Sequence, residues 1–138
     1  MKSSMNKILD IKNLNVNFSS QYGTIHAVKD INISLKPGEI LGIVGESGAG
    51  KSTIGNAIIN LLEPPGKIIN GKIIFNGQDL RDLNDKQMQV IRGNKIGMIF
   101  QDPQVSLNPL MTIGRQLIET IINTTNLFGN SAFDRAID

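Results

Sequence analysis

Two kinds of hydrophobic pattern occur along the chain. Residues 8–18 and 25–35 alternate between apolar and polar side chains, which is typical of strands with one buried face. Within the first run, a break near Asn13 indicates two short strands rather than one. Residues 40–44 (ILGIV) and 96–100 (IGMIF) are instead continuously apolar, as strands are when both faces are covered. The sequence therefore predicts an antiparallel β region and, separately, strands of a buried type.

The centre of the chain carries one helix signal and two turn signals. Apolar residues three and four positions apart between Ile54 and Leu62 form the stripe of a helix, which Pro64-Pro65-Gly66 ends. The pairs Asn70-Gly71 and Asn76-Gly77 then bracket residues 72–75. Because Asn-Gly is a strong signal for tight hairpin turns, both pairs predict a hairpin in this region.

Three more helices are expected toward the end of the chain. Asn84 and Gln87 have the spacing of a capping box, which predicts a helix that runs to about Arg92. Thr112 is placed to cap a helix with a marked apolar stripe, and Ser131 to open another.

Composition excludes several classes of chemistry. The chain has 138 residues, no Cys and one His, so a disulfide scaffold, a cysteine nucleophile, a Cys-based zinc site and a His cluster are all excluded. A net charge of +2 without a basic run argues against a nucleic-acid partner. No apolar stretch approaches the roughly 18 residues that span a bilayer, and the polar start lacks the apolar centre of a signal peptide. We expect a cytoplasmic location.

A glycine-rich sequence follows the first continuously apolar run. Residues 45–52 read GESGAGKS and match the pattern G-x-x-x-x-G-K-[ST] in full. Its glycines let successive backbone N–H groups point at one anion, and the next helix adds its free N–H groups and positive dipole end. Lys51 supplies a charge for the β- and γ-phosphates, and the Ser52 hydroxyl is a ligand for Mg²⁺. We predict a nucleotide-binding site formed by Gly45, Glu46, Ser47, Gly48, Ala49, Gly50, Lys51, Ser52 and Thr53.

Two other interpretations of this loop are less favoured. A dinucleotide-binding loop would require G-x-G-x-x-G, which the sequence does not match. A glycine-rich loop that merely turns the chain needs neither the apolar run before it nor the helix stripe after it.

Beyond the loop, the chain resembles the ATPase subunits of ABC transporters. IFQDP at residues 99–103 is similar to the Q-loop of these subunits, and QDPQVSLNP at 101–109 resembles the oligopeptide, dipeptide and nickel importer branch. GIVGESGAGKST at 42–53 and LLEPPGKIINGKIIFNGQDL at 61–80 support the same branch. The resemblance runs from residue 8 to about residue 123, and its layout is closer to the D-type subunit of the two that pair in such importers.

The resemblance implies an α/β fold. It consists of a P-loop NTPase (RecA-like) core with an antiparallel β subdomain, truncated before the helical subdomain is complete. Residues 1–138 would form the N-terminal part of one nucleotide-binding domain. Its expected parts are an antiparallel β region with the A-loop (8–38), a strand, the Walker A loop and a helix (39–64), a β hairpin, a helix and the Q-loop strand (65–101), and the start of the helical subdomain (102–138).

The resemblance also implies roles for residues outside the loop. Tyr22 takes the A-loop position, where an aromatic ring stacks on adenine, although it could also be a plain turn aromatic. Phe18 is the other aromatic candidate, but its place in an alternating run favours the core. Gln101 would be catalytic by positioning water, and it joins Ser52 as an implied Mg²⁺ ligand; the plainer alternative is a capped strand end. ATP and Mg²⁺ are thus the implied cofactors.

Three polar residues are not expected to take part in catalysis. His26 lies in a predicted strand, far in sequence from the place of the family's catalytic histidine. Asp102 is beside Gln101 but is not the family's Mg²⁺-binding aspartate, which ends a later strand. Glu46 occupies a variable position of the loop and is not a general base.

Several parts that the family uses for hydrolysis do not occur among the 138 residues. These are the LSGGQ signature, the Walker B strand with its Asp and Glu, and the switch histidine. We therefore expect the binding half of an ATPase, from a truncated gene product or a partial sequence, which does not hydrolyse ATP in isolation. Strands that would cover residues 40–44 and 96–100 are also missing, which predicts poor stability.

The resemblance implies an ATPase subunit at the cytoplasmic face of the membrane. It would pair with a second ABC ATPase subunit and drive transmembrane permease subunits, served by a substrate-binding protein, to import peptides or nickel. The alternative is a non-catalytic nucleotide-binding remnant of such a subunit. A P-loop kinase or GTPase would need an arginine lid or Asn-Lys-x-Asp, and neither occurs. The 101–109 sequence and the small net charge disfavour a nucleic-acid-repair ATPase.

Overall fold

The computed structural model describes residues 7–101 and 107–138. The chain forms two compact units, Met1–Asn84 and Asp85–Asp138. Each unit is described by itself below.

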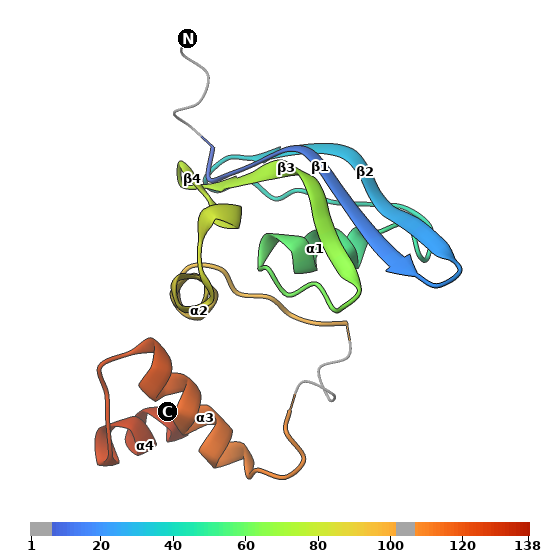
Figure 1. Cartoon of the computed structure of the whole chain (residues 1–138). Helices are drawn as coiled ribbons and strands as arrows, with labels where there is room; N and C mark the ends of the chain where they lie inside the picture. Colours follow the sequence, from blue (N-terminus) through green and yellow to red (C-terminus); the bar gives the residue numbers. More distant parts are fainter. Residues whose placement is uncertain (1–6, 102–106) are drawn as a thin grey trace. The chain divides into compact units, whose positions relative to one another are not determined.

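The first unit is built on a four-stranded antiparallel sheet with the strand order β2-β1-β3-β4 (Figure 1). The two long strands β1 and β2 form a hairpin, and β3 returns along the other edge of β1. The helix α1 follows β2 in sequence and contacts it. The elements are β1 (Leu9–Ser20), β2 (Gly23–Leu35), α1 (Lys51–Ile58), β3 (Gly66–Phe75), β4 (Gln78–Asp79) and the 3-10 helix η1 (Leu80–Asp82).

The core of this unit lies on one face of β1 and its neighbours. Leu14 and Val16 alternate onto the buried face of β1, and the register shift between Ile11 and Leu14 lets Ile11 be buried as well. Ile73 faces Ile11 from β3. Ile54 and Ala57, on one stripe of α1, are buried as well. Burying each large aliphatic side chain contributes about 1.5–3 kcal/mol, so this face supplies much of the unit's stability.

One long strand replaces the two short strands expected around Asn13. The ladder between β1 and β2 shifts register at this point, because Asn13 and Asp30 both adopt positive φ, 47° and 51°. Side chains replace the lost backbone bonds: Asn13 Nδ2 donates to Asp30 Oδ1 over 2.7 Å, and the Asp30 N–H donates to Asn15 Oδ1 over 3.1 Å. The predicted break is thus a bulge inside one continuous strand.

The two Asn-Gly pairs behave differently. Asn76-Gly77 forms the predicted tight turn, with Phe75 opposite Gln78. The hairpin expected at Asn70-Gly71 is wrong, since both residues lie inside β3. Gly71 has a φ of 103°, and a β-carbon there would lie 2.5 Å from the carbonyl oxygen of Asn13. The glycine therefore lets β3 approach the bulge of β1.

The strands expected at residues 40–44 and 96–100 are not formed. A strand needs a neighbour that completes its hydrogen-bond ladder, and the sheet of the first unit ends at β2 and β4. The apolar side chains stay exposed as a result: Ile40 is 98 % exposed and Ile99 is 94 % exposed.

Helix α1 is shorter than the apolar stripe suggested. It ends at Ile58, because Asn60 adopts a left-handed conformation with φ 54°. The N–H of Asn60 donates to Ala57 O, and the N–H of Leu61 donates to Asn56 O, which together form a Schellman motif. Leu61 therefore lies beyond the helix, and the chain turns before it reaches the prolines.

The second unit contains three helices: α2 (Asp85–Asn94), α3 (Ile113–Thr124) and α4 (Asn130–Ile137). The predicted cap of α3 is confirmed, because the N–H of Arg115 donates to Thr112 Oγ1 over 3.3 Å. Helix α2 begins directly after Asn84, as expected. Helix α4 has Gly129 rather than Ser131 at its N-cap. Among the described residues, no helix is both long and apolar enough to cross a membrane.

The close approach at Gly71 predicts a large loss of stability for Gly71→Ala. Alanine would be strained at φ 103° and would collide with the Asn13 backbone, so we expect unfolding to become easier by about 3 kcal/mol or more. Gly77→Ala is the matched control, because its φ is 85° but no atom lies within 4 Å of the added carbon; we expect about 1 kcal/mol. Urea unfolding at neutral pH measures both values, and equal losses would contradict the close approach.

The ion pairs of Asp10 predict a dependence of stability on pH. Burial raises the pKa of the Asp10 carboxyl, but hydrogen bonds and charges from Lys7 and Lys12 outweigh it and hold the pKa below its ordinary value. A carboxyl with a lowered folded pKa stabilises the protein above its unfolded pKa, about 4, and this stability is lost as pH falls through the folded pKa.

We therefore expect Asp10→Asn to reduce the free energy of unfolding at pH 7 by about 1 kcal/mol or less. The difference from the unsubstituted protein should shrink as pH falls below about 4. Urea unfolding at several pH values measures this, with Asp82→Asn, an exposed carboxylate on η1, as the control. A difference that is independent of pH would contradict the role of the charge.

Candidate phosphate-binding site

The glycine-rich sequence forms a loop that leads directly into α1. Gly48 and Gly50 have positive φ, 81° and 85°, which glycine adopts without strain. The N–H of Ala49 donates to Glu46 O over 3.2 Å and closes a turn within the loop. The side chains of Glu46, Ser47 and Ala49 are exposed. These side chains therefore do not pack into the core, and the glycines and this turn set the conformation of the loop.

Unused N–H donors gather where the loop becomes helix. The first bond of α1 runs from the Ile54 N–H to Gly50 O over 3.0 Å, and no side chain caps the helix. In the part of the chain that the structure describes, the N–H groups of residues 50–53 have no acceptor. Unpaired donors at the positive end of a helix dipole suit an anionic oxygen. This arrangement fits a phosphate group.

The side chain of Lys51 folds back over the loop. Its Nζ donates to Gly45 O over 2.7 Å and to Glu46 O over 2.6 Å. An ammonium group has three donors, so one remains for a further acceptor. Lys51 thus holds the start of the loop near the helix and keeps a positive charge at the loop.

The residues after Lys51 offer hydroxyl groups. Ser52 is exposed and Thr53 is half-buried on the first turn of α1. No group of three or more His, Cys, Asp or Glu residues that could hold a metal occurs among the described residues. Since Mg²⁺ is often held by few protein ligands together with phosphate oxygens, the Ser52 hydroxyl fits a Mg²⁺ site of that kind.

The end of the loop is pressed against β2. Gly50 is buried, and a β-carbon there would lie 2.3 Å from the carbonyl oxygen of Ala27 and 3.4 Å from Val28 Cγ2. No sequence pattern points to Ala27 or Val28. The only local sequence signal is Gly50 itself, and a glycine does not indicate which residues pack against it.

The two aromatic candidates differ in exposure. Tyr22 lies at the tip of the β1–β2 hairpin, and 91 % of its surface is exposed. Its backbone N–H donates to Ser20 Oγ over 3.2 Å, so the turn is fixed while the ring is left uncovered. Phe18 lies in the ladder opposite Ile25, and its ring packs over Gly66. Of these two rings, that of Tyr22 is the more accessible to a ligand.

Gln101 lies in the second unit and is exposed. Residues 102–106, which include Asp102 and most of the QDPQVSLNP sequence, lie outside the described residues. Asn108, near the end of that sequence, is hydrogen-bonded to α3. Gln116 Oε1 accepts from the Asn108 N–H over 2.9 Å, and Gln116 Nε2 donates to Asn108 O over 3.1 Å. No sequence pattern indicates this role for Gln116.

His26 lies on the exposed side of β2. Its Nδ1 is 2.9 Å from Asn17 Oδ1, the side chain directly opposite on β1. This cross-strand hydrogen bond accounts for the histidine on the surface of the sheet.

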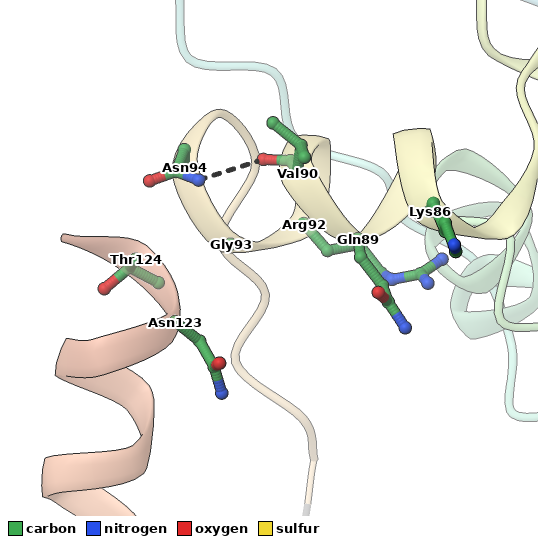
Figure 2. Close-up of a pocket in the computed structure, with 8 residues that line it drawn as sticks. All are labelled: Lys86, Gln89, Val90, Arg92, Gly93, Asn94, Asn123 and Thr124. Carbon is green, nitrogen blue, oxygen red and sulfur yellow. Dashed lines mark hydrogen bonds between the residues drawn. The ribbon is translucent and has the colours of Figure 1, made fainter. Parts of the chain in front are cut away.

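A hollow of about 650 Å³ lies in the second unit, between α2 and the end of α3 (Figure 2). Its lining includes two cationic side chains and no acid, and Asn94 Nδ2 is occupied by a hydrogen bond to Val90 O. None of the predicted site residues lines this hollow. The lining residues are Lys86, Gln89, Val90, Arg92, Gly93, Asn94, Asn123 and Thr124.

Comparison with known proteins gives a consistent result. The sequence profile of the ABC transporter family matches residues 28–137. The oligopeptide transport ATP-binding protein OppD of Bacillus subtilis is 43% identical over 133 residues, which are 96% of this chain and 37% of that protein. The dipeptide transport ATP-binding protein DppD of Bacillus subtilis is 46% identical over 119 residues, 86% of this chain and 36% of that protein. This chain therefore spans little more than a third of the length of these relatives.

A solved structure is similar as well. A dimeric ATP-binding cassette in a post-hydrolysis state, bound to ADP and Pi, matches with a TM-score of 0.79 and 31% sequence identity. The match covers 94% of this chain and 54% of that structure. The expected α/β fold of a P-loop ATPase domain is thereby confirmed.

Proposed function

Since the chain belongs to the ABC transporter family, we propose that it is the nucleotide-binding part of the ATPase subunit of a peptide importer. In this proposal the Gly45–Thr53 loop holds the phosphates of ATP, and the subunit uses ATP hydrolysis to drive import. The relatives described above are named for oligopeptide and dipeptide transport, which favours peptides over nickel as the substrate class.

The observation that carries this proposal is the set of free N–H groups at the start of α1. The N–H groups of residues 50–53 have no acceptor among the described residues, and the ammonium group of Lys51 lies over the same loop. Donors and a positive charge in one place match the needs of a triphosphate tail. No acidic side chain replaces the anion there, because the helix has no side-chain cap.

Other residues complete the proposed site. The exposed ring of Tyr22 would stack on adenine, and the Ser52 hydroxyl would hold Mg²⁺ beside the phosphates. Bound Mg²⁺ neutralises phosphate charge during transfer. Gln101, also proposed as a Mg²⁺ ligand, would orient the attacking water with its neutral amide.

The proposed setting follows that of the family. The subunit would lie at the cytoplasmic face of the membrane, pair with a second ABC ATPase subunit, and drive transmembrane permease subunits that receive substrate from a binding protein. Since the signature, Walker B and switch-histidine sequences are not among the 138 residues, we expect this chain alone to bind ATP without turnover. A non-catalytic remnant is the alternative, and the coding sequence after Asp138 distinguishes the two.

Replacement of the loop lysine tests the proposal. Lys51→Ala removes the charge over the loop and its hydrogen bonds to Gly45 and Glu46, so we expect ATP affinity to fall by at least about 10- to 100-fold. Lys36→Ala, which removes an exposed lysine from a turn, is the control and should leave affinity unchanged. Titration calorimetry with ATP and Mg²⁺ measures both. Unchanged binding by Lys51→Ala would refute the proposed site.

Replacement of Tyr22 tests the adenine contact separately. Stacking of a base on an aromatic ring contributes about 1–3 kcal/mol, so Tyr22→Ala should weaken ATP binding by about 5- to 160-fold. Tyr22→Phe keeps the ring and should bind ATP like the unsubstituted chain. Inorganic tripolyphosphate lacks the base, so its affinity should not change in either variant. An equal loss for ATP and tripolyphosphate in Tyr22→Ala would show that the ring does not contact adenine.

A further inference from the structure

We infer that Val28, together with the bulged residue Ala27, is a positioning element of β2. The two residues hold Gly50 in place and thereby orient the N–H groups of the phosphate loop. This inference rests on the proposed function of the loop as a phosphate site. Neither residue would touch the nucleotide in this role. Each would act through Gly50.

The pairing of β1 with β2 shows why β2 contacts Gly50 at this point. Val16 pairs with Val28 and Asn17 pairs with His26, so Ala27 is left out of the register between them. Ala27 is therefore the extra residue of a β-bulge. A bulge releases one residue from regular pairing and redirects its backbone groups. The Ala27 carbonyl is the group that lies closest to the position of a Gly50 β-carbon.

The contact itself is close and buried. A β-carbon on Gly50 would lie 2.3 Å from Ala27 O and 3.4 Å from Val28 Cγ2, so the glycine rests directly on both residues. Val28 is 4 % exposed and Gly50 is buried. Close packing leaves no room for Gly50 to shift toward β2.

The consequence for the loop follows from its place in the chain. Gly50 is the N-cap of α1, and its carbonyl accepts the first helical hydrogen bond, from the Ile54 N–H over 3.0 Å. The free N–H groups of the first turn follow immediately. Holding Gly50 against β2 therefore fixes the direction in which these donors point. Since Tyr22 precedes the same strand, β2 links the proposed adenine contact to the phosphate loop.

Truncating the side chain of Val28 should weaken its packing against Gly50. Val28→Ala deletes the two methyl groups, including the one nearest Gly50, without changing any group proposed to bind ATP. Because misplaced binding groups lose much of their effect, we expect about fivefold weaker ATP binding. Val28→Ile keeps the contact and should restore binding.

Val16→Ala is the matched control. Val16 lies opposite Val28 in the ladder, is 0% exposed and loses the same two methyl groups. The atoms nearest to Gly50 belong to Ala27 and Val28 rather than to Val16. We therefore expect Val16→Ala to destabilise the sheet but to change ATP affinity by less than about twofold.

Hydrogen exchange without any ligand provides a second measurement. In Val28→Ala, the Ile54 amide, which bonds to Gly50, should exchange faster relative to the Ile58 amide in the same helix. A general loss of stability would accelerate both amides alike, as expected for Val16→Ala. Equal effects of the two variants, or no change at Ile54 in Val28→Ala, would overturn the inference. If the unsubstituted chain fails to bind ATP, the proposed function fails, and the exchange ratio still decides whether Val28 positions the loop.

Discussion

An α-helix leaves its first N–H groups without intrahelical acceptors, and in the first turn of α1 several of them have no protein acceptor among the described residues. They persist because Gly50 adopts a left-handed conformation as N-cap and because no side chain covers the helix start. The same glycine is pressed onto β2, where its missing β-carbon makes room for the Ala27 carbonyl. One residue thus meets two demands, a backbone conformation and a close contact. Any larger residue at this position would violate both.

The sheet that supports the loop is irregular at several points. Between β1 and β2 the register shifts three times, once at the strand position next to Gly50. The shift at Asn13 is sealed by side-chain amides and carboxylates rather than by backbone pairs, with Asn32 Oδ1 accepting from the Asn13 N–H over 2.9 Å. Short polar side chains can satisfy backbone groups that a bulge leaves unpaired. The abundance of Asn in these strands therefore has a structural explanation.

Features encoded by neighbouring residues could be predicted well from the sequence. The Thr112 cap and the turn at Asn76-Gly77 depend on a few adjacent residues, and both lie where expected. The helix after the glycine-rich loop also forms, but it ends at Ile58 rather than near Leu62. The runs at 40–44 and 96–100 were expected to be strands, but pairing depends on distant segments that the local pattern does not contain. Asn70-Gly71 has the composition of a turn, yet its glycine serves the approach of β3 to β1.

The candidate site likewise has parts that could be predicted from the sequence and parts that could not. Its loop and lysine could be identified from spacing alone, because the chemistry of phosphate binding fixes residue types over eight consecutive positions. The support from Ala27 and Val28 could not, since it joins residues more than twenty positions apart through a bulge that no pattern announces. The assigned roles of Tyr22 and Gln101 came from the family resemblance and remain predictions.

The two ends of the loop are held unequally. On the downstream side Gly50 is anchored to the sheet, whereas on the upstream side the backbone N–H groups of residues 40–45 have no acceptor in the described segments. The cross-link between them is the lysine ammonium, which grips the carbonyls of Gly45 and Glu46. The downstream end of the loop is therefore fixed by packing, whereas the upstream end depends on the hydrogen bonds of Lys51. An anion that draws the ammonium away from these two carbonyls would therefore release the upstream end of the loop, while Gly50 would stay packed against β2.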